Sequence, residues 1–262
     1  MNGWLPATAV ITGGASGIGL AIAQRLAAKG TRVMLADLDG EKLDAAAASI
    51  DGALSRGCDV SDLEDVKRLA GAAFDSFGTV ELLLNNAGVG GVRGKLWKVD
   101  PADARAHFDI NFWGVWHGCH AFAPRMVEQR VPSAIYNTGS ENSFFCAVPQ
   151  TAAYIAAKHA VLGMTESLRE DLPEHVHAGL IIPGWVFTPL GDARMMQHGM
   201  DVGQYAEIVV PQLLARRRFV VSHRSNLKRI DERMDDLRAS YAAHGVDDGA
   251  DVRDKLAELF KR

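Results

Sequence analysis

The sequence is poor in cysteine, and this excludes two classes of small scaffold. Its three cysteines, Cys58, Cys119 and Cys146, are scattered along 262 residues and form no C-x-x-C pair. Thiols this few and this widely spaced give neither a disulfide framework nor a zinc site. The scattered histidines show no ligand spacing either, so we expect no bound metal.

Long apolar runs and a strong charge of one sign are also missing. No stretch approaches the roughly 20 apolar residues that a helix needs to cross a bilayer. Residues 1–6 carry neither the basic start nor the apolar run of a secretion signal. The formal net charge of −4 argues against a nucleic-acid binder, which would show a basic patch. We therefore expect a soluble, cytoplasmic protein with neither a membrane nor a nucleic acid as partner.

The sequence does have a regular alternation of short apolar runs and longer amphipathic segments. This alternation predicts βαβ units, and hence a single α/β domain with a doubly wound, Rossmann-type parallel sheet and helices on both faces. The expected strands are Ala7–Thr12, Arg32–Ala36, Ala53–Cys58, Val80–Leu84, Ala134–Asn137 and His177–Ile182. The expected helices are Gly19–Lys29, Glu41–Ile50, Leu63–Phe77, Pro101–Phe122 and Ala152–Leu172.

The pattern changes in the last quarter of the chain. Residues 189–218 show no clear strand, are rich in methionine, and are expected to bind the substrate. Residues 225–262 are highly charged and have a helical period. This tail either packs on the domain as a solvated amphipathic helix or helps to bind a second subunit. Its apolar positions, on one helix face, are Ile230, Met234, Leu237 and Tyr241.

A glycine-rich turn, Thr12-Gly-Gly-Ala-Ser-Gly-Ile-Gly19, joins the first expected strand to the first helix. Glycine allows the tight bend and the close approach of backbone to a pyrophosphate, and a helix N-terminus offers N–H groups to it. The spacing G-x-x-x-G-x-G differs from the commoner G-x-G-x-x-G, and a simple turn is the alternative. The position between strand and helix nevertheless predicts a dinucleotide site. The residues expected to contact the dinucleotide are Gly13, Ser16, Gly17, Ile18 and Gly19.

The second expected strand leads into Asp37, which is 18 residues past Gly19. An acidic side chain there can accept hydrogen bonds from both ribose hydroxyls of an adenosine, and it would repel a 2′-phosphate. Asp37 and Leu38 are both expected to contact the cofactor, and neither Ser16 nor Leu38 supplies a compensating cation. The sequence therefore predicts NAD rather than NADP, although Asp37 could instead cap a helix or a turn.

Tyr154 and Lys158 are four residues apart in an expected helix, so their side chains lie on one face. A phenol titrates near pH 10, and a neighbouring ammonium is expected to lower that pKa towards the range useful for acid–base chemistry. Ser140, fourteen residues before Tyr154, follows an expected strand, and its hydroxyl could hold a substrate oxygen beside the phenol. The tyrosine–lysine spacing alone also fits an ordinary amphipathic helix.

Together and in this chain order, these features resemble the short-chain dehydrogenase/reductase family, from about Ala7 to Thr188. The resemblance implies an NAD-dependent oxidoreductase that interconverts a secondary alcohol and its ketone, and that is a homo-oligomer, either a dimer or a tetramer. It implies that Tyr154 is the acid–base residue and that Lys158 holds the nicotinamide ribose. Ser140 would orient the substrate oxygen, and Asn111 would complete a proton relay.

The resemblance also places further residues along the cofactor. Asp59 and Val60 would meet the adenine, and the Asn85-Asn86-Ala87-Gly88 segment would stabilise the sheet and line the cofactor. The residues after the sixth strand would meet the nicotinamide. The further cofactor residues implied in this way are Asp59, Val60, Asn86, Ala87, Gly88, Pro183, Gly184, Val186 and Thr188, together with Tyr154 and Lys158.

The chain departs from the family pattern after Ser140. The separation of fourteen between Ser140 and Tyr154 is one more than is usual, and Ser143 is a less favoured substitute. The candidate substrate residues are mostly apolar, which favours a lipophilic or aryl alcohol; core packing would explain many of them equally well. They are Ser140, Glu141, Phe144, Phe145, Val148, Trp185, Leu190 and Met195.

Two other functions stay open at this point. A catalytically silent nucleotide-binding or sensor protein can share the fold, since fold does not fix function. A sensor has no need of an acid–base trio, which favours the enzyme. A reductase of sugar or acyl-thioester ketones is the other alternative.

Overall fold

The computed structural model describes residues 4–190, 193–246, 249 and 251–259. The chain divides into two compact units, Met1–His223 and Arg224–Arg262, which we call the sheet unit and the tail unit. The sheet unit contains the whole of the strand–helix alternation. The tail unit consists of the helices α9 (Leu227–His244) and α10 (Val252–Leu259).

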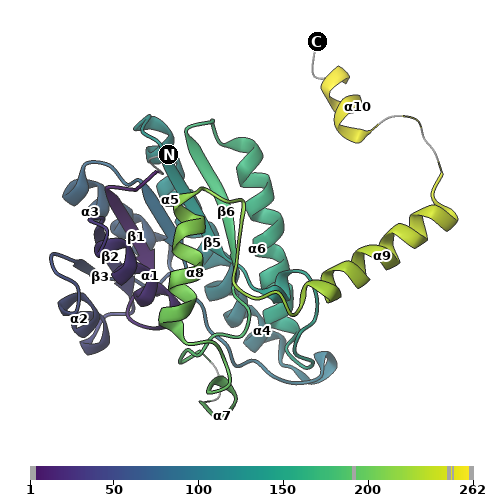
Figure 1. Ribbon diagram of the computed structural model, residues 1–262, viewed down its shortest axis with the longest axis horizontal. Helices are drawn as coiled ribbons and strands as arrows, with labels where there is room; N and C mark the ends of the chain where they lie inside the picture. Colours follow the sequence, from purple (N-terminus) through teal and green to yellow (C-terminus); the bar gives the residue numbers. More distant parts are fainter. Residues whose placement is uncertain (1–3, 191–192, 247–248, 250, 260–262) are drawn as a thin grey trace. The chain divides into compact units, whose positions relative to one another are not determined.

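Among the described residues, seven parallel strands form one sheet in the order β3-β2-β1-β4-β5-β6-β7 (Figure 1). The predicted doubly wound parallel sheet is therefore confirmed. The strands are β1 (Thr8–Thr12), β2 (Arg32–Asp37), β3 (Leu54–Gly57), β4 (Leu82–Asn85), β5 (Ser133–Thr138), β6 (Val176–Ile182) and β7 (Phe219–Val221). The sequence did not predict β7, because three residues are too few to give a strand pattern.

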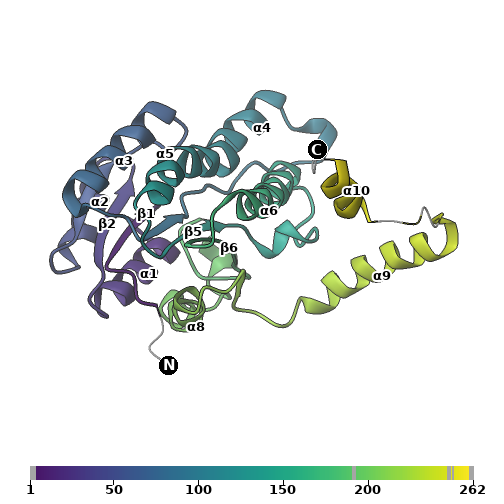
Figure 2. The ribbon, with the colours of Figure 1, turned by 90° about the horizontal axis from the view of Figure 1, so that it is seen from above.

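Helices cover both faces of the sheet. Figure 2 shows α1 and α8 on one side of the strands and α3, α5 and α6 on the other. Ile11 and Leu35 belong to the core on the α1 side, whereas Val10 and Leu83 belong to the core on the α3 side, because successive strand residues point to opposite faces. The helices are α1 (Gly17–Ala27), α2 (Glu41–Ala48), α3 (Leu63–Phe77), α4 (Pro101–Phe108), α5 (Gly114–Glu128), α6 (Ala152–Asp171), α7 (Ala193–Met196) and α8 (Val202–Leu214).

The prediction of one helix over Pro101–Phe122 is wrong, because a π-helical turn interrupts it. The helix α4 begins where the Asp100 carboxylate accepts a hydrogen bond from the backbone N–H of Ala102 at 2.8 Å. The π turn, η2 (Asp109–Trp113), then separates α4 from α5. Such turns are frequent at functional sites, and this one contains Asn111.

The order of the strands fixes where a ligand can bind. The chain order reverses between β1 and β4, which are neighbours in the sheet. The helices that follow these two strands, α1 and α5, therefore lie on opposite faces of the sheet (Figure 2). The carboxyl edge at this reversal is where open α/β sheets bind ligands. The glycine turn follows β1, and Asn86-Ala87-Gly88 follows β4.

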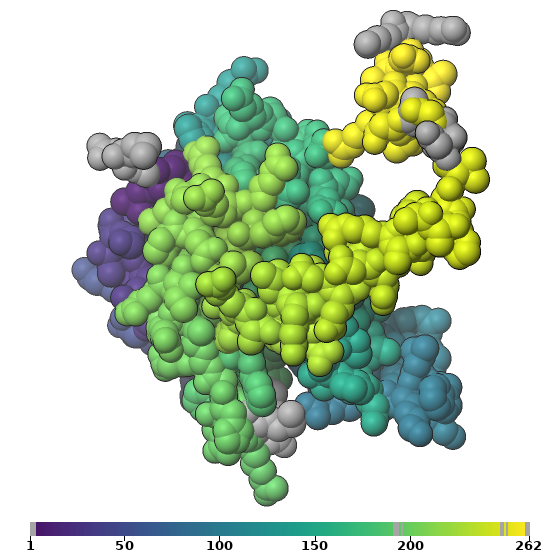
Figure 3. Space-filling view, turned by 45° about the vertical axis from the view of Figure 1, so that its right-hand side comes forward, coloured from purple at the N-terminus to yellow at the C-terminus, as the bar shows by residue number. Residues whose placement is uncertain are grey.

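The predicted substrate segment is mostly helical where it is described. Its helix α8 packs against α1, and an ion pair joins Glu207 of α8 to Arg25 of α1. In the space-filling view the green surface of this part of the chain borders the purple N-terminal residues (Figure 3).

The tail unit keeps the predicted pattern on α9. Of its four predicted apolar positions, Met234, Leu237 and Tyr241 are exposed and Ile230 is half-buried. Of the helices in the described ranges, none combines the length and the apolar content that crossing a membrane requires.

Candidate active site

The turn between β1 and α1 has the backbone shape of a pyrophosphate cradle. Gly13 and Gly17 have φ angles of 64° and 54°, a region that other residues rarely adopt. A Cβ atom on Gly13 would lie 2.8 Å from the Cα atom of Ala87, and one on Gly19 would lie 2.3 Å from the Gly13 carbonyl oxygen. The N-cap residue Ser16 makes no side-chain capping bond, so the first N–H groups of α1 are not capped by it and can face an anion.

Hydrogen bonds from two side chains tie this turn to the loop after β4. Thr12 Oγ1 accepts from the backbone N–H groups of Asn86 and Ala87, at 2.9 and 3.1 Å. The Asn86 amide donates in return to the carbonyl oxygens of Thr12 and Gly13, at 3.1 and 3.3 Å. The two loops therefore form one connected floor, and the residues expected to line the cofactor lie within it.

Asp37 holds its carboxylate beside the glycine turn. One oxygen accepts from the N–H of Ala15 at 3.0 Å, and the other accepts from the N–H of Leu38 at 2.9 Å. Arg56 pairs with Ala36 across β2 and β3, so its side chain leaves the opposite face of the sheet from that of Asp37. The carboxylate keeps unused lone pairs with which it can accept hydroxyl groups.

The residues expected to contact the adenine are held in place by side chains that the sequence did not identify. The exposed Asp59 closes a turn, because its carboxylate accepts from the N–H and the hydroxyl of Ser61 at 2.9 and 2.7 Å. The carbonyl oxygen of the buried Val60 lies 2.9 Å from Nδ1 of His117 on α5. His117 is 57 residues from Val60, and no sequence pattern connects the two.

Three predicted catalytic side chains meet at the carboxyl end of β5. Ser140 follows the strand, and Tyr154 and Lys158 lie one turn apart on α6. A hydrogen bond joins the side chains of Ser140 and Tyr154. The Lys158 ammonium lies 5.7 Å from the centre of the Tyr154 ring and donates to the carbonyl oxygen of Thr138 at 2.8 Å. Lys158 is only 4% exposed, so its charge lies inside the protein.

Burial dominates the titration of this group. It raises the pKa of Tyr154, and the hydrogen bond with Ser140 offsets only part of that rise. Burial also lowers the pKa of Lys158 to about 8, because an ammonium is costly away from water. The pKa of Tyr154 is therefore raised in the chain alone and not lowered as expected, because loss of hydration outweighs the hydrogen bond with Ser140.

Ser143 has a structural role and does not take the place of Ser140 as the candidate catalytic serine. It is 1% exposed, and its hydroxyl donates to the carbonyl oxygen of Lys158 at 2.8 Å. The Ser143 hydroxyl oxygen in turn accepts from the backbone N–H of Ser140 at 3.2 Å. Ser143 thus couples the loop after β5 to α6 and holds Ser140 near Tyr154.

Asn111 is buried in the π turn and is joined to the loop after β4. Its Oδ1 accepts from the N–H of Val89 at 3.2 Å, and its Nδ2 donates to the carbonyl oxygen of Val89 at 3.0 Å. A Cβ atom on Gly88 would lie 2.8 Å from this Oδ1 and 3.9 Å from the Lys158 Nζ. Asn111 and Lys158 therefore flank Gly88, and a larger residue there would displace the Asn111 amide.

The residues after β6 approach the loop that carries Ser140. The carbonyl oxygen of Pro183 accepts from the N–H of Glu141 at 3.0 Å. A Cβ atom on Gly184 would lie 2.5 Å from Nδ1 of His223 and 3.0 Å from Oε1 of Glu141. Two polar side chains therefore border Gly184 at this end of the site.

Val186 and Thr188, which come next in the chain, differ in whether their side chains can contact a ligand. A Cβ atom on Gly17 would lie 3.4 Å from the Thr188 side chain, so Thr188 sits at the glycine turn. Val186 is 3% exposed and its side chain belongs to the core, so the expected contact with a nicotinamide can come only from its backbone.

The candidate substrate residues fall into two groups. Phe145 is buried, and the ring of Phe144 packs against that of Phe219 with centroids 6.2 Å apart, so these two contribute mainly to the interior. The side chain of Met195 lies outside the described residues. The apolar candidates that remain exposed are Val148, Trp185 and Leu190.

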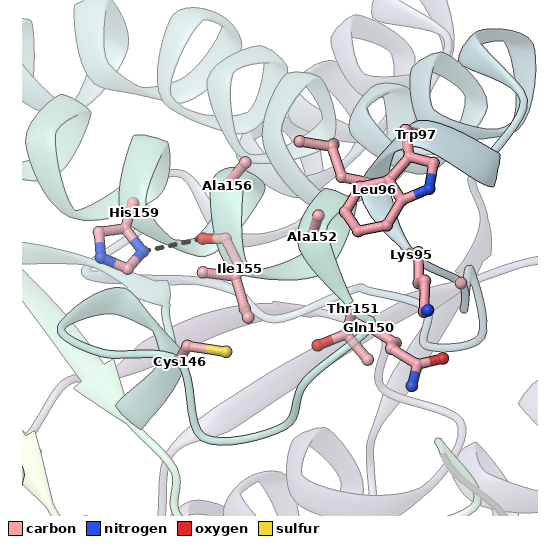
Figure 4. A pocket seen from close by; sticks show the side chains of 11 residues that line it. Lys95, Leu96, Trp97, Cys146, Gln150, Thr151, Ala152, Ile155, Ala156 and His159 are labelled. Atoms are coloured by element: carbon pink, nitrogen blue, oxygen red, sulfur yellow. Dashed lines mark hydrogen bonds between the residues drawn. The ribbon is translucent and has the colours of Figure 1, made fainter.

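A cavity of about 600 Å³ lies along another face of the same turns of α6 (Figure 4). Ile155, Ala156 and His159 line it together with Trp97 from the segment after β4. The ring of His159 lies 2.9 Å from the carbonyl oxygen of Ile155, the contact dashed in the figure. None of the three catalytic candidates lines this cavity, so it is separate from the site.

The site thus combines an anion-binding turn with a buried group that can move a proton. Within the described ranges, no group of three or more histidine, cysteine, aspartate or glutamate side chains could hold a metal ion. The fit of glycine backbone to a pyrophosphate and of Asp37 to a ribose is the fit that a dinucleotide needs.

Residues 7–198 match the family model of the short chain dehydrogenases. The chain belongs to this family. It is 40% identical over 194 residues to 1-deoxy-11-beta-hydroxypentalenate dehydrogenase of Streptomyces avermitilis, covering 71% of this chain and 70% of that protein. It is 34% identical over 196 residues to 2,5-dichloro-2,5-cyclohexadiene-1,4-diol dehydrogenase of Sphingobium indicum, covering 74% and 76%.

A solved structure carries the same fold. It is a short chain dehydrogenase/reductase from Burkholderia phymatum in complex with NAD, with a TM-score of 0.85 and 31% identity over 92% of this chain and 97% of that chain. As a member of this family the chain is an oxidoreductase, and the family uses nicotinamide cofactors.

Proposed function

We propose that this short-chain dehydrogenase is an NAD-dependent enzyme that interconverts a lipophilic or aryl secondary alcohol and its ketone. The observation that carries the proposal is the meeting of Ser140, Tyr154 and Lys158 next to the loop after β4, which is hydrogen-bonded to the glycine turn. A silent nucleotide sensor on this fold would need only the turn, and it would have no use for a buried lysine next to a tyrosine.

The three side chains divide the proton chemistry between them. In alcohol oxidation, Tyr154 accepts the hydroxyl proton, while the bound nicotinamide supplies the hydride acceptor. Ser140 orients the substrate oxygen and stabilises the charge that develops on it. Lys158 favours the phenolate form of Tyr154 through its positive charge and binds the nicotinamide ribose. The proton then leaves through the relay in which Asn111 takes part.

Burial makes the positive charges around Tyr154 necessary. A raised pKa keeps the phenol protonated in the chain alone, so it cannot act as a base without help. Lys158, with a pKa of about 8, is still mostly protonated at neutral pH. Its ammonium and the positive charge of an oxidised nicotinamide both favour the phenolate, which couples proton transfer to binding of the cofactor.

Asp37 supports NAD over NADP. Its carboxylate is held at the glycine turn by the N–H groups of Ala15 and Leu38. A 2′-phosphate at this position would meet a negative charge at short range.

The open side of the site supports an apolar substrate. Trp185 and Leu190 are about half exposed, at 48% and 45%, and offer apolar surface to a ligand. The names of the two relatives, a hydroxypentalenate dehydrogenase and a diol dehydrogenase, denote enzymes that act on alcohols. A sugar or acyl-thioester ketone is the second candidate class.

Exposed aromatic side chains support a homo-oligomer, which we propose to be a dimer or a tetramer. Trp113 and Trp116, at the junction of η2 and α5, are 43% and 45% exposed, and their rings pack on each other 5.7 Å apart. Trp97, which lines the cavity beside α6, is 74% exposed. Apolar surface of this kind is typical of interfaces between subunits.

A panel of secondary alcohols tests the substrate class, with absorbance of the reduced cofactor as the readout. We expect kcat/KM for 1-phenylethanol to exceed that for 2-propanol by about tenfold or more, because each buried apolar group adds binding in the transition state. Equal or reversed values would contradict the apolar site.

The Tyr154→Phe variant tests the chemistry on the best alcohol of that panel. We expect kcat to fall about a thousandfold, since the phenol oxygen that moves the proton is gone. The ring is retained, so the Kd for NADH should stay close to that of the wild type. Turnover at the wild-type rate would show that another group is the base.

Fluorescence titration with the reduced cofactors tests the role of Asp37. NADH should bind about tenfold more tightly than NADPH, because the carboxylate repels the 2′-phosphate. Asp37→Ser should reduce the difference between the Kd values for NADH and NADPH. The neighbouring Asp39→Ser serves as a control and should leave that difference unchanged. Tighter binding of NADPH by the wild type would refute the argument.

Light scattering tests the oligomer. A chain of 28.2 kDa should give the mass of two or four copies. Replacing Trp113 and Trp116 together by Glu should release smaller species, because charged side chains are depleted from interface cores. Leu5→Glu, at another exposed apolar position, is the control and should not change the mass. A monomeric wild type would contradict the proposal.

A further inference from the structure

His107 is a buried histidine that the mechanism above does not use. It lies on α4, is 2% exposed, and packs edge-to-face with Tyr154, the two ring centroids being 6.0 Å apart at 61°. Its Nε2 lies 3.2 Å from Nδ2 of Asn111. One imidazole therefore contacts both the proposed acid–base residue and the proposed relay residue.

The hydrogen bonds of Asn111 determine which nitrogen of His107 carries the proton. The N–H of Val89 donates to Oδ1 and the carbonyl oxygen of Val89 accepts from Nδ2, so the amide can be placed in only one way round. Nδ2 is thus the atom that faces His107, where it also lies 3.1 Å from the His107 carbonyl oxygen. Nδ2 has two hydrogens: one points to the Val89 carbonyl oxygen, and the other is shared between the carbonyl oxygen and Nε2 of His107. Because Nδ2 offers no lone pair to a ring N–H, Nε2 is favoured as the acceptor, which puts the proton of a neutral His107 on Nδ1.

A second proton on this ring would be unfavourable. Burial lowers the pKa of His107, and the positive charge of Lys158 on α6 lowers it further. The groups around the ring are the phenol of Tyr154 and the ammonium of Lys158 from α6, and the amide of Asn111 from the π turn. None of these is an anion while the phenol is protonated, and a protonated Nε2 would face the N–H of Asn111.

The Nδ1–H group is a buried donor without a hydrogen-bond partner in the described part of the chain. A buried donor left without an acceptor costs free energy, so such groups usually meet a water or a ligand oxygen. This donor belongs to a ring that touches Tyr154, on the side of α6 that carries the proposed catalytic residues.

We propose that His107 is a positioning residue for proton transfer, held neutral with its proton on Nδ1, which fixes Asn111 through Nε2 and supports the phenol of Tyr154. The inference rests on the proposed function, in which Tyr154 is the acid–base group. His107 itself does not exchange a proton during the reaction.

Three variants test this role in alcohol oxidation. His107→Leu removes the acceptor for Asn111, and we expect kcat to fall about tenfold while KM for NAD changes less than about twofold, because the reacting groups lose their alignment and the cofactor floor stays intact. His107→Gln can restore an acceptor to Asn111 and should recover most of the rate. His175→Leu removes a histidine whose Nε2 lies 3.0 Å from the Val127 carbonyl oxygen, far from the site, and serves as a matched control.

The pH profile separates positioning from a loss of stability. Activity in oxidation requires the phenolate, so kcat falls as the pH drops through the apparent pKa of Tyr154. In His107→Leu the pH at which kcat falls to half should rise by about half a pH unit or more, because hydrocarbon replaces a polar neighbour of the phenolate. In His175→Leu the melting temperature can fall, but the pH at which kcat falls to half should not change.

The outcomes distinguish this inference from the function on which it rests. If Tyr154→Phe loses turnover while His107→Leu keeps the wild-type kcat and the wild-type dependence of kcat on pH, the positioning role is wrong and the proposed function stands. If Tyr154→Phe keeps its rate, the proposed function itself is wrong.

Nitrogen-15 NMR tests the tautomer in the wild-type protein, and it covers the case in which His107→Leu does not fold. The His107 signal, assigned by its absence in His107→Gln, should show a neutral ring with the proton on Nδ1 from pH 6 to 8. A proton on Nε2, or a ring that titrates in this range, would overturn the proposal.

Discussion

The pairing of β1 with β4 is the constraint on which the rest of the site depends. It places two loops that are more than 70 residues apart side by side, and Thr12 and Asn86 then bind them together from both directions. The glycine turn can take its shape only against this second loop, because a Cβ on Gly13 would strike Ala87. The cradle is therefore a property of the sheet order as much as of the glycines.

The same loop after β4 reaches the catalytic side of the site. Val89 holds the amide of Asn111, and Gly88 lies between Asn111 and the ammonium of Lys158. The proposed cofactor floor and the proposed proton relay thus share one stretch of backbone. Little space is left for water here, so burial both raises the pKa of Tyr154 and lowers that of Lys158. In the chain alone the phenol stays protonated, whereas Lys158 keeps most of its charge at neutral pH. Under the proposed function, a positively charged nicotinamide would favour the phenolate and so tie the chemistry to the presence of the cofactor.

The strands and the glycine turn could be predicted because their signals are local: buried parallel strands are apolar throughout, and the turn directly follows one of them. The π turn could not, since the residues of Asp109–Trp113 are as compatible with a continuous helix as with a widened one. The upward shift of the Tyr154 pKa could not be predicted, because spacing on a helix indicates which groups are neighbours but not how much water reaches them. His107 had a usable signal, since it precedes Asn111 by four residues and so shares its helix face.

The unusual distance in sequence between Ser140 and Tyr154 has a structural explanation. The segment after Ser140 forms a short 3₁₀ turn, Glu141–Ser143, in which the Ser140 hydroxyl accepts from the N–H of Asn142 at 3.1 Å. Ser143 then bonds to the carbonyl oxygen of Lys158, on the same helix as Tyr154. The position of Ser140 is therefore set by two fixed points, the end of β5 and the backbone of α6, and not by the number of residues that connect them. A loop with one extra residue can bulge away at Cys146–Gln150, where the chain is exposed, without moving the hydroxyl from the phenol.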